Sequence, residues 1–118
     1  MNTLTFEYSE DRFNKTFTLD YSLSHHAMSR CQQRGITKEM ILTTIRFGTQ
    51  ISKQGFTYYY ATKRSIPARV KRTLKREVND LVIMVNEVEG VVVTCYWCYK
   101  GLIHLRKKPQ SLLRYNAA

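Results

Sequence analysis

Alternating and continuous runs of apolar residues predict five β-strands along the chain. Residues 3–8 (TLTFEY) and 15–19 (KTFTL) are rich in Thr and aromatic residues and flank a polar stretch, which predicts a hairpin. Residues 56–62 (FTYYYAT) alternate between two faces, as a strand does. Residues 81–87 and 91–98 are almost continuously apolar, which indicates a second hairpin of largely buried strands. We expect these last three strands to lie in one antiparallel sheet.

Two adjacent helices are predicted between the first hairpin and the next strand. The first spans residues 24–34, with Gly35 placed to adopt the left-handed conformation that ends many helices. The second follows Thr37, a favourable N-cap residue, and continues to Phe47. Its apolar face consists of Met40, Ile41, Thr44 and Ile45. Both helices are therefore expected to pack side by side on one face of the sheet.

A third helix is predicted in the sequence IPARVKRTLKREVND, with Pro67 near its first turn and an apolar stripe at every fourth position. Its remaining faces carry five cations: Arg69, Lys71, Arg72, Lys75 and Arg76. The tail, GLIHLRKKPQSLLRY, is expected to form a short basic helix before Pro109. The element order ββααβαββ predicts a single α+β domain over residues 1–118, with a mostly antiparallel sheet.

Composition narrows the class of protein. The chain has 118 residues, of which 43% are hydrophobic, and this is enough for a core. No apolar run approaches the roughly 20 residues of a membrane span, and the first residues lack the basic and apolar regions of a signal peptide. Three cysteines, an odd number, fit a reducing compartment better than a disulfide framework. We therefore expect a cytoplasmic protein without a membrane partner.

Positive charge is concentrated in one stretch of the sequence. The formal net charge is +10, and residues 21–76 hold 12 Lys or Arg but a single acid, Glu39. The rest of the chain has 7 basic and 8 acidic residues. A one-sided positive field attracts phosphate polymers, anionic membranes or acidic proteins, and basicity alone is also compatible with a merely soluble protein. Of these partners, a nucleic acid is the one we expect.

The first predicted helix carries a basic ridge. His26, Arg30 and Arg34 follow one another at four-residue steps, which places them along one edge of its apolar face. Like charges at this spacing cost about 0.2–0.5 kcal/mol, and an anion between the two guanidinium groups would reverse that cost. An imidazole beside two fixed cations suits phosphodiester cleavage without a metal, because it accepts a 2′-hydroxyl proton while arginine stabilises the charge on phosphorus.

A structural interpretation of the ridge stands beside the catalytic one. A histidine in a first helical turn often bonds only to the backbone, and Arg34 near the helix end complements the helix dipole. Tyr58 and Tyr60 share a strand face and suit base stacking or phosphate binding, but alternating tyrosines are also common in sheet packing. The basic third helix suits a nucleic-acid backbone, and a solvated helix face explains it as well.

The cysteines give no clear metal or redox site. Cys95 and Cys98 are three residues apart in a predicted strand and hence on opposite faces, which suits neither a zinc site nor a redox pair. A tetrahedral zinc would need two further ligands from Cys31, His25, His26 and His104. We expect small buried hydrophobic side chains instead, and neither a metal nor another cofactor.

Three segments together resemble a bacterial family known as domain of unknown function 4258. They are SHHAMSRCQQRGIT, KQGFTYYYATKRSIP and LVIMVNEVEGVVVTCYW, and the resemblance covers about residues 21–107. Residues 1–20 are then an N-terminal hairpin extension and 108–118 a tail. The family is remotely similar to RelE-like toxins, in which two helices pack on an antiparallel sheet and which are metal-independent ribonucleases. The resemblance implies a RelE-like fold, RNA as substrate and a small acidic antitoxin or immunity protein as partner.

Two functions from different classes follow. The first is an endoribonuclease of toxin type that uses 2′-hydroxyl attack, with His26 as the proton-transfer residue and Arg30 and Arg34 as phosphate stabilisers. Tyr58 or Tyr60 would assist, and the basic third helix would hold the RNA. The second is a non-catalytic nucleic-acid-binding or regulatory module in which the same ridge only grips phosphate.

Overall fold

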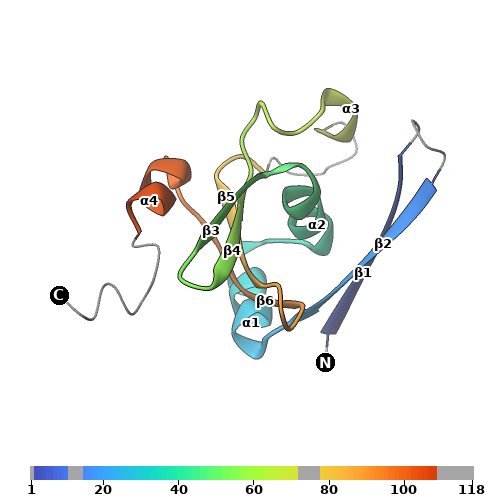
Figure 1. Ribbon diagram of the computed structural model, residues 1–118, viewed down its shortest axis with the longest axis horizontal. Coiled ribbons are helices and arrows are strands. Elements are labelled where there is room, and N and C mark those ends of the chain that lie inside the picture. The colour runs from blue at the N-terminus through green and yellow to red at the C-terminus, as the bar shows by residue number, and fades with distance from the viewer. Residues whose placement is uncertain (1, 11–14, 72–77, 109–118) are drawn as a thin grey trace.

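The computed structural model describes residues 2–10, 15–71 and 78–108. Within these ranges the chain forms one six-stranded sheet in the order β1-β2-β6-β5-β4-β3 (Figure 1). The strands are β1 (Asn2–Glu10), β2 (Lys15–Leu23), β3 (Thr49–Lys53), β4 (Phe56–Tyr60), β5 (Leu81–Asn86) and β6 (Val91–Trp97). The helices are α1 (His25–Arg34), α2 (Lys38–Phe47), α3 (Ala68–Lys71) and α4 (Gly101–Lys107). The predicted α+β class is confirmed.

The local signals for α1 and α2 are confirmed by their end geometry. Ser24 caps α1 by accepting a hydrogen bond from the backbone N–H of Ala27 at 3.0 Å. Gly35 ends the helix with φ 65°, the left-handed conformation that glycine adopts without steric cost. Thr37 caps α2 through a bond from the N–H of Met40 at 3.2 Å. Short polar side chains at these positions therefore fix where both helices begin.

The sheet contains one strand more than predicted, and this corrects the expected order. Residues 49–53 (TQISK) form β3, which pairs antiparallel with β4 through a tight turn. Gln54 and Gly55 in this turn both have positive φ, 57° and 82°, as a two-residue hairpin turn requires. The predicted strand 56–62 ends at Tyr60. The sequence of β3 is short and mostly polar, so it lacks the apolar pattern that predicts a buried strand. β3 lies at the edge of the sheet and pairs on one side only.

The pairings of the sheet are antiparallel except one. β2 runs parallel to β6 and meets it only at Ser22–Val91 and Leu23–Val92. The strands predicted at 56–62, 81–87 and 91–98 are neighbours, as expected. In Figure 1 the β1–β2 hairpin extends away from the rest of the molecule. β4, β5 and β6 therefore form the centre of the sheet, against which the helices pack.

Helices cover both faces of this centre, and each face has its own buried cluster. α1 and α2 contribute Ala27, Cys31, Met40, Ile41 and Ile45 to the larger cluster, which includes Ile83 and Cys95 from the sheet. α4 covers the opposite face, where Leu105 packs with Tyr58, Tyr60 and Val82 (Figure 1). No helix in the described ranges is long and apolar enough to cross a membrane.

The third predicted helix is described only at its beginning. Pro67 precedes α3, which spans four residues and carries Arg69 and Lys71 in exposed positions. Arg72, Lys75 and Arg76 lie outside the described residues, and so does the middle of the predicted apolar stripe. The expected basic helix before Pro109 is confirmed as α4.

Candidate nucleic-acid interface

The basic ridge lies on the solvent side of α1, at the edge of its buried face. Ala27 and Cys31 are the buried residues of this helix. His26 and Arg34 are exposed, and Arg30 is half-buried. Ser24 fixes the start of the helix to the sheet, because its Oγ also donates to the carbonyl oxygen of Val93 at 2.9 Å. The start of the helix that carries the ridge is therefore tied to β6.

Both arginines of the ridge bond to neutral oxygens. Nη1 of Arg30 donates to Oε1 of Gln33 at 2.9 Å. Nη1 of Arg34 donates to the carbonyl oxygen of Cys95 at 2.6 Å, which ties the end of α1 to β6. Neither of these partners, both within the described residues, is an acid. Arg34 is thus partly structural, through a bond to the sheet that its helical position did not indicate.

Tyr58 and Tyr60 lie far from the ridge, on the other face of the sheet. Only 2% and 4% of their surfaces are exposed, because α4 covers them. The Tyr60 hydroxyl donates to Oδ1 of Asp80 at 2.5 Å, and burial together with this bond raises the pKa of Tyr60 to about 12. Burial also raises the pKa of Tyr58. The structure therefore does not assemble the predicted set of ridge and tyrosines, since the sheet separates them.

Two exposed aromatic side chains stand where β6 ends. The exposed fraction of Trp97 is 39% and that of Tyr99 is 76%. Nε1 of Trp97 donates to the backbone carbonyl of Arg34 at 3.4 Å, so this ring lies beside the end of α1. Nζ of Lys100 lies 5.6 Å from the centre of the Tyr99 ring. Sequence reasoning missed these residues, although the three aromatic residues followed by a lysine in YWCYK were a signal for them.

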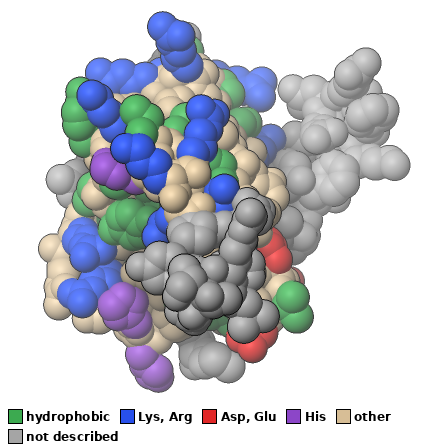
Figure 2. Space-filling view, turned by 60° about the vertical axis from the view of Figure 1, so that its left-hand side comes forward, with side chains coloured by type: hydrophobic (Ala, Val, Ile, Leu, Met, Phe, Trp, Pro, Cys, Tyr) green, Lys and Arg blue, Asp and Glu red, His purple; other side chains and the backbone are tan. Residues whose placement is uncertain are grey.

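α4 continues this surface with cations. Gly101 and Leu105 are its buried residues, and the exposed positions include His104, Arg106 and Lys107. Gly101 is required here, because a Cβ would lie 2.5 Å from Cε1 of Tyr60. We call the exposed set the β6–α4 surface: Trp97, Tyr99, Lys100, His104, Arg106 and Lys107. This surface runs around the end of β6, from Trp97 on the α1 side of the sheet to α4 on the other side. In Figure 2, Lys and Arg gather over the left and upper parts of the visible face, and Asp and Glu appear only at its lower right.

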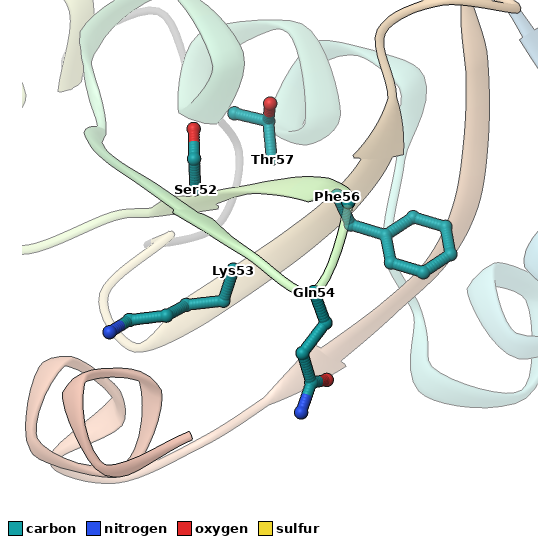
Figure 3. Close-up of a pocket in the computed structure, with 6 residues that line it drawn as sticks. Ser52, Lys53, Gln54, Phe56 and Thr57 are labelled. Carbon is teal, nitrogen blue, oxygen red and sulfur yellow. The ribbon is translucent and has the colours of Figure 1, made fainter. Parts of the chain in front are cut away.

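A hollow of about 250 Å³ lies at the β3–β4 turn next to this surface. Figure 3 shows Ser52 and Thr57 on one side of the hairpin and Lys53 on the other, extending towards α4. The residues that line the hollow include one cation and no acid. Lys53 therefore extends the positive field of the β6–α4 surface.

The cations of α3 form a separate group. Arg69 and Lys71 are exposed, and Nζ of Lys71 donates to the backbone carbonyl of Lys63. This part of the predicted nucleic-acid-binding helix is solvated and has no exposed aromatic residue within its described turn.

Comparisons of the chain with protein-family models, curated proteins and solved structures find no match. Within the described ranges, no three His, Cys, Asp or Glu side chains are grouped so that they could hold a metal ion.

Proposed function

We propose that this protein binds single-stranded RNA on its β6–α4 surface. The observation that carries the proposal is the exposure of Trp97 and Tyr99 beside Arg34 and Lys100. Every base has an aromatic face, so exposed rings in a basic surface bind unpaired bases while the cations neutralise phosphates. The resemblance to domain of unknown function 4258, and through it to RelE-like proteins, supports RNA as the partner.

Binding accounts for the geometry better than cleavage does. A metal-independent ribonuclease needs a proton-transfer group and charge stabilisers around one phosphate. His26, Arg30 and Arg34 share the ridge, but Arg34 is bonded to Cys95 and the tyrosines are buried on the other face. The ridge therefore serves as a margin of the binding surface that contacts phosphate. A cytoplasmic location belongs to the same proposal, and a small acidic antitoxin would compete with RNA for these cations.

Trp97 allows the proposal to be tested without a label, because it is the only tryptophan in the chain. Stacking of a base on this ring should quench its fluorescence when a short single-stranded RNA is added. The variants Trp97→Ala and Tyr99→Ala should each weaken RNA binding about 5- to 100-fold, as expected for the loss of one stacked base. Because Trp97→Ala lacks the fluorescent residue, its affinity is measured by the anisotropy of labelled RNA.

Val88→Ala is the matched control, since Val88 is 97% exposed and lies in the β5–β6 turn between two acids. Its affinity should equal that of the wild type. Equal affinity of the Trp97 and Tyr99 variants, or tighter binding of the same RNA as a duplex, would refute the proposed surface. Cleavage of the RNA in the presence of chelator, lost in His26→Ala and leaving a 2′,3′-cyclic phosphate, would instead restore the catalytic interpretation of the ridge.

A further inference from the structure

Two buried cysteines face each other between α1 and β6. Sγ of Cys31 lies 2.8 Å from Sγ of Cys95, and the two residues are 64 positions apart in the sequence. The exposed fraction is 8% for Cys31 and 0% for Cys95. Cys98, the partner considered for Cys95 from the sequence, packs on the opposite face of the sheet. The fold thus pairs two thiols that no local spacing connects.

Hydrogen bonds hold the two elements that carry this pair against each other. α1 is tied to β6 on both sides of Cys31, by Ser24 to Val93 at 2.9 Å and by Arg34 to Cys95 at 2.6 Å. A disulfide has an S–S distance of about 2.05 Å, so the sulfur atoms need to approach by only about 0.8 Å. The two sulfur atoms therefore already lie close to bonding distance.

Cys31 is also within reach of a small oxidant. It lines a cavity of about 250 Å³ between α1, the end of β2 and the start of α2, together with Leu23, Met28, Gln32, Ile36 and Ile41. A water molecule occupies about 30 Å³ of liquid, so this cavity has room for a peroxide. The hydrogen bond with Cys95 and the charge of Arg34 lower the pKa of Cys31, although burial opposes them, and the thiolate is the reactive form of cysteine.

We propose that Cys31 and Cys95 are a peroxide-oxidised disulfide site, a property that does not depend on RNA binding. The Cys31 thiolate attacks one oxygen of hydrogen peroxide, an S–O bond forms, the O–O bond breaks, and the departing hydroxide takes up a proton to become water. The Cys95 sulfur then attacks the Cys31 sulfur. The S–S bond forms, the S–O bond breaks, and the hydroxyl leaves with the Cys95 proton as a second water. Two thiols are oxidised and one peroxide is reduced.

Mass spectrometry of the whole chain tests this site. The reduced protein is treated with hydrogen peroxide, unfolded, and alkylated with iodoacetamide. The expected product has lost two hydrogen atoms, contains a peptide that links Cys31 to Cys95, carries the alkyl group on Cys98, and reverts with dithiothreitol. Cys98→Ser should form the same link at the same rate. The bond closes a long loop, so the oxidised protein should melt at a temperature higher by about 5 °C or more.

Variants of the second cysteine identify the order of the steps. Cys95→Ala and Cys95→Ser, each checked by circular dichroism, should accumulate a sulfenic acid on Cys31 that dimedone traps. The proposal is overturned if both cysteines of Cys98→Ser are still alkylated after peroxide treatment. It is also overturned if the peroxide product links Cys98 to another cysteine or joins two chains.

Discussion

Three consecutive tyrosines in β4 show how one position along a strand decides the environment of a side chain. Tyr59 points to the α1 and α2 side, where its hydroxyl donates to Oε1 of Glu87. The Tyr21 hydroxyl lies 3.4 Å from Oε2 of the same carboxylate. Tyr58 and Tyr60 point to the α4 side. Since at most 8% of the surface of each of the three tyrosines of β4 is exposed, the three rings act as core residues.

Ionisation of buried tyrosines is expected to lower the free energy of unfolding at alkaline pH. The pKa of Tyr60 and that of Tyr96 are raised to about 12, chiefly by burial, from an ordinary value of 10. Between pH 10 and 12 the unfolded chain therefore loses phenol protons that the folded protein keeps. The contribution of these two tyrosines to the free energy of unfolding should be constant up to about pH 10 and fall as the pH rises towards 12.

Urea unfolding followed by circular dichroism at several pH values measures this decline. Tyr60→Phe should show a shallower decline, because one proton no longer differs between the two states. At pH 7 the same variant should lose about 1 kcal/mol with its bond to Asp80. A decline in Tyr60→Phe as steep as in the wild type would contradict this assignment.

The sequence predicts those features of the site that depend on the geometry of a single helix or strand. Helical spacing predicted that His26, Arg30 and Arg34 follow one edge of the apolar face, and α1 has this arrangement. Alternation predicted that Tyr58 and Tyr60 share a face. Neither pattern says which element covers that face, nor that Arg34 bonds to a carbonyl 61 residues away. Such contacts depend on which strands become neighbours, and a single sequence pattern does not contain that information.

At the scale of elements, α1 is held by one hydroxyl at its start. The Ser24 Oγ accepts from Ala27 and donates to Val93, so it serves both the helix end and the contact with β6. Ser24→Ala should lower the free energy of unfolding by about 1–2 kcal/mol, the range measured for loss of a cap.

Ser29→Ala is the control on the same helix, because Ser29 is exposed. It should change stability by no more than about 0.5 kcal/mol, since alanine favours a helix. Chemical unfolding of both variants separates a cap from an ordinary serine. Equal stability of the two would show that the hydroxyl of Ser24 contributes little.

The helices whose ends are marked by capping residues were predictable from the sequence. The strand and the strand contact that depend on pairing with distant or edge strands were not. Ser24, Gly35 and Thr37 mark the helix ends by their own chemistry. β3 consists of five mostly polar residues, and its identity comes from its register with β4. The parallel contact of β2 with β6 rests on two residue pairs 69 positions apart. Non-local pairing of this kind leaves no periodic trace in the sequence.

At the scale of the whole molecule, charge along the chain differs from charge on the surface. Residues 21–76 hold the excess of Lys and Arg, but the cations of the β6–α4 surface follow residue 97. Folding places this surface beside Arg34 through the contact of Trp97 with the end of α1. The cations of α3 belong to the excess stretch, and Figure 1 shows α3 and α4 on different sides of the molecule. Two basic surfaces are therefore candidates for the proposed contact with RNA.

Salt dependence distinguishes these two surfaces. For single strands, the slope of log K against log salt concentration is about −0.7 per neutralised phosphate. Two double variants remove the same charge from exposed positions. One combines Arg106→Gln and Lys107→Gln on α4, and the other combines Arg69→Gln and Lys71→Gln on α3. If RNA lies on the β6–α4 surface, the α4 pair should reduce the magnitude of the slope by about 1.4, and the α3 pair should leave it close to the wild-type value. Anisotropy titrations of one short RNA between 50 and about 300 mM salt measure both slopes. A larger reduction in the α3 pair would place the RNA on the helix that the sequence predicted, because the overall loss of charge is identical in the two proteins and only the position of the lost contacts differs.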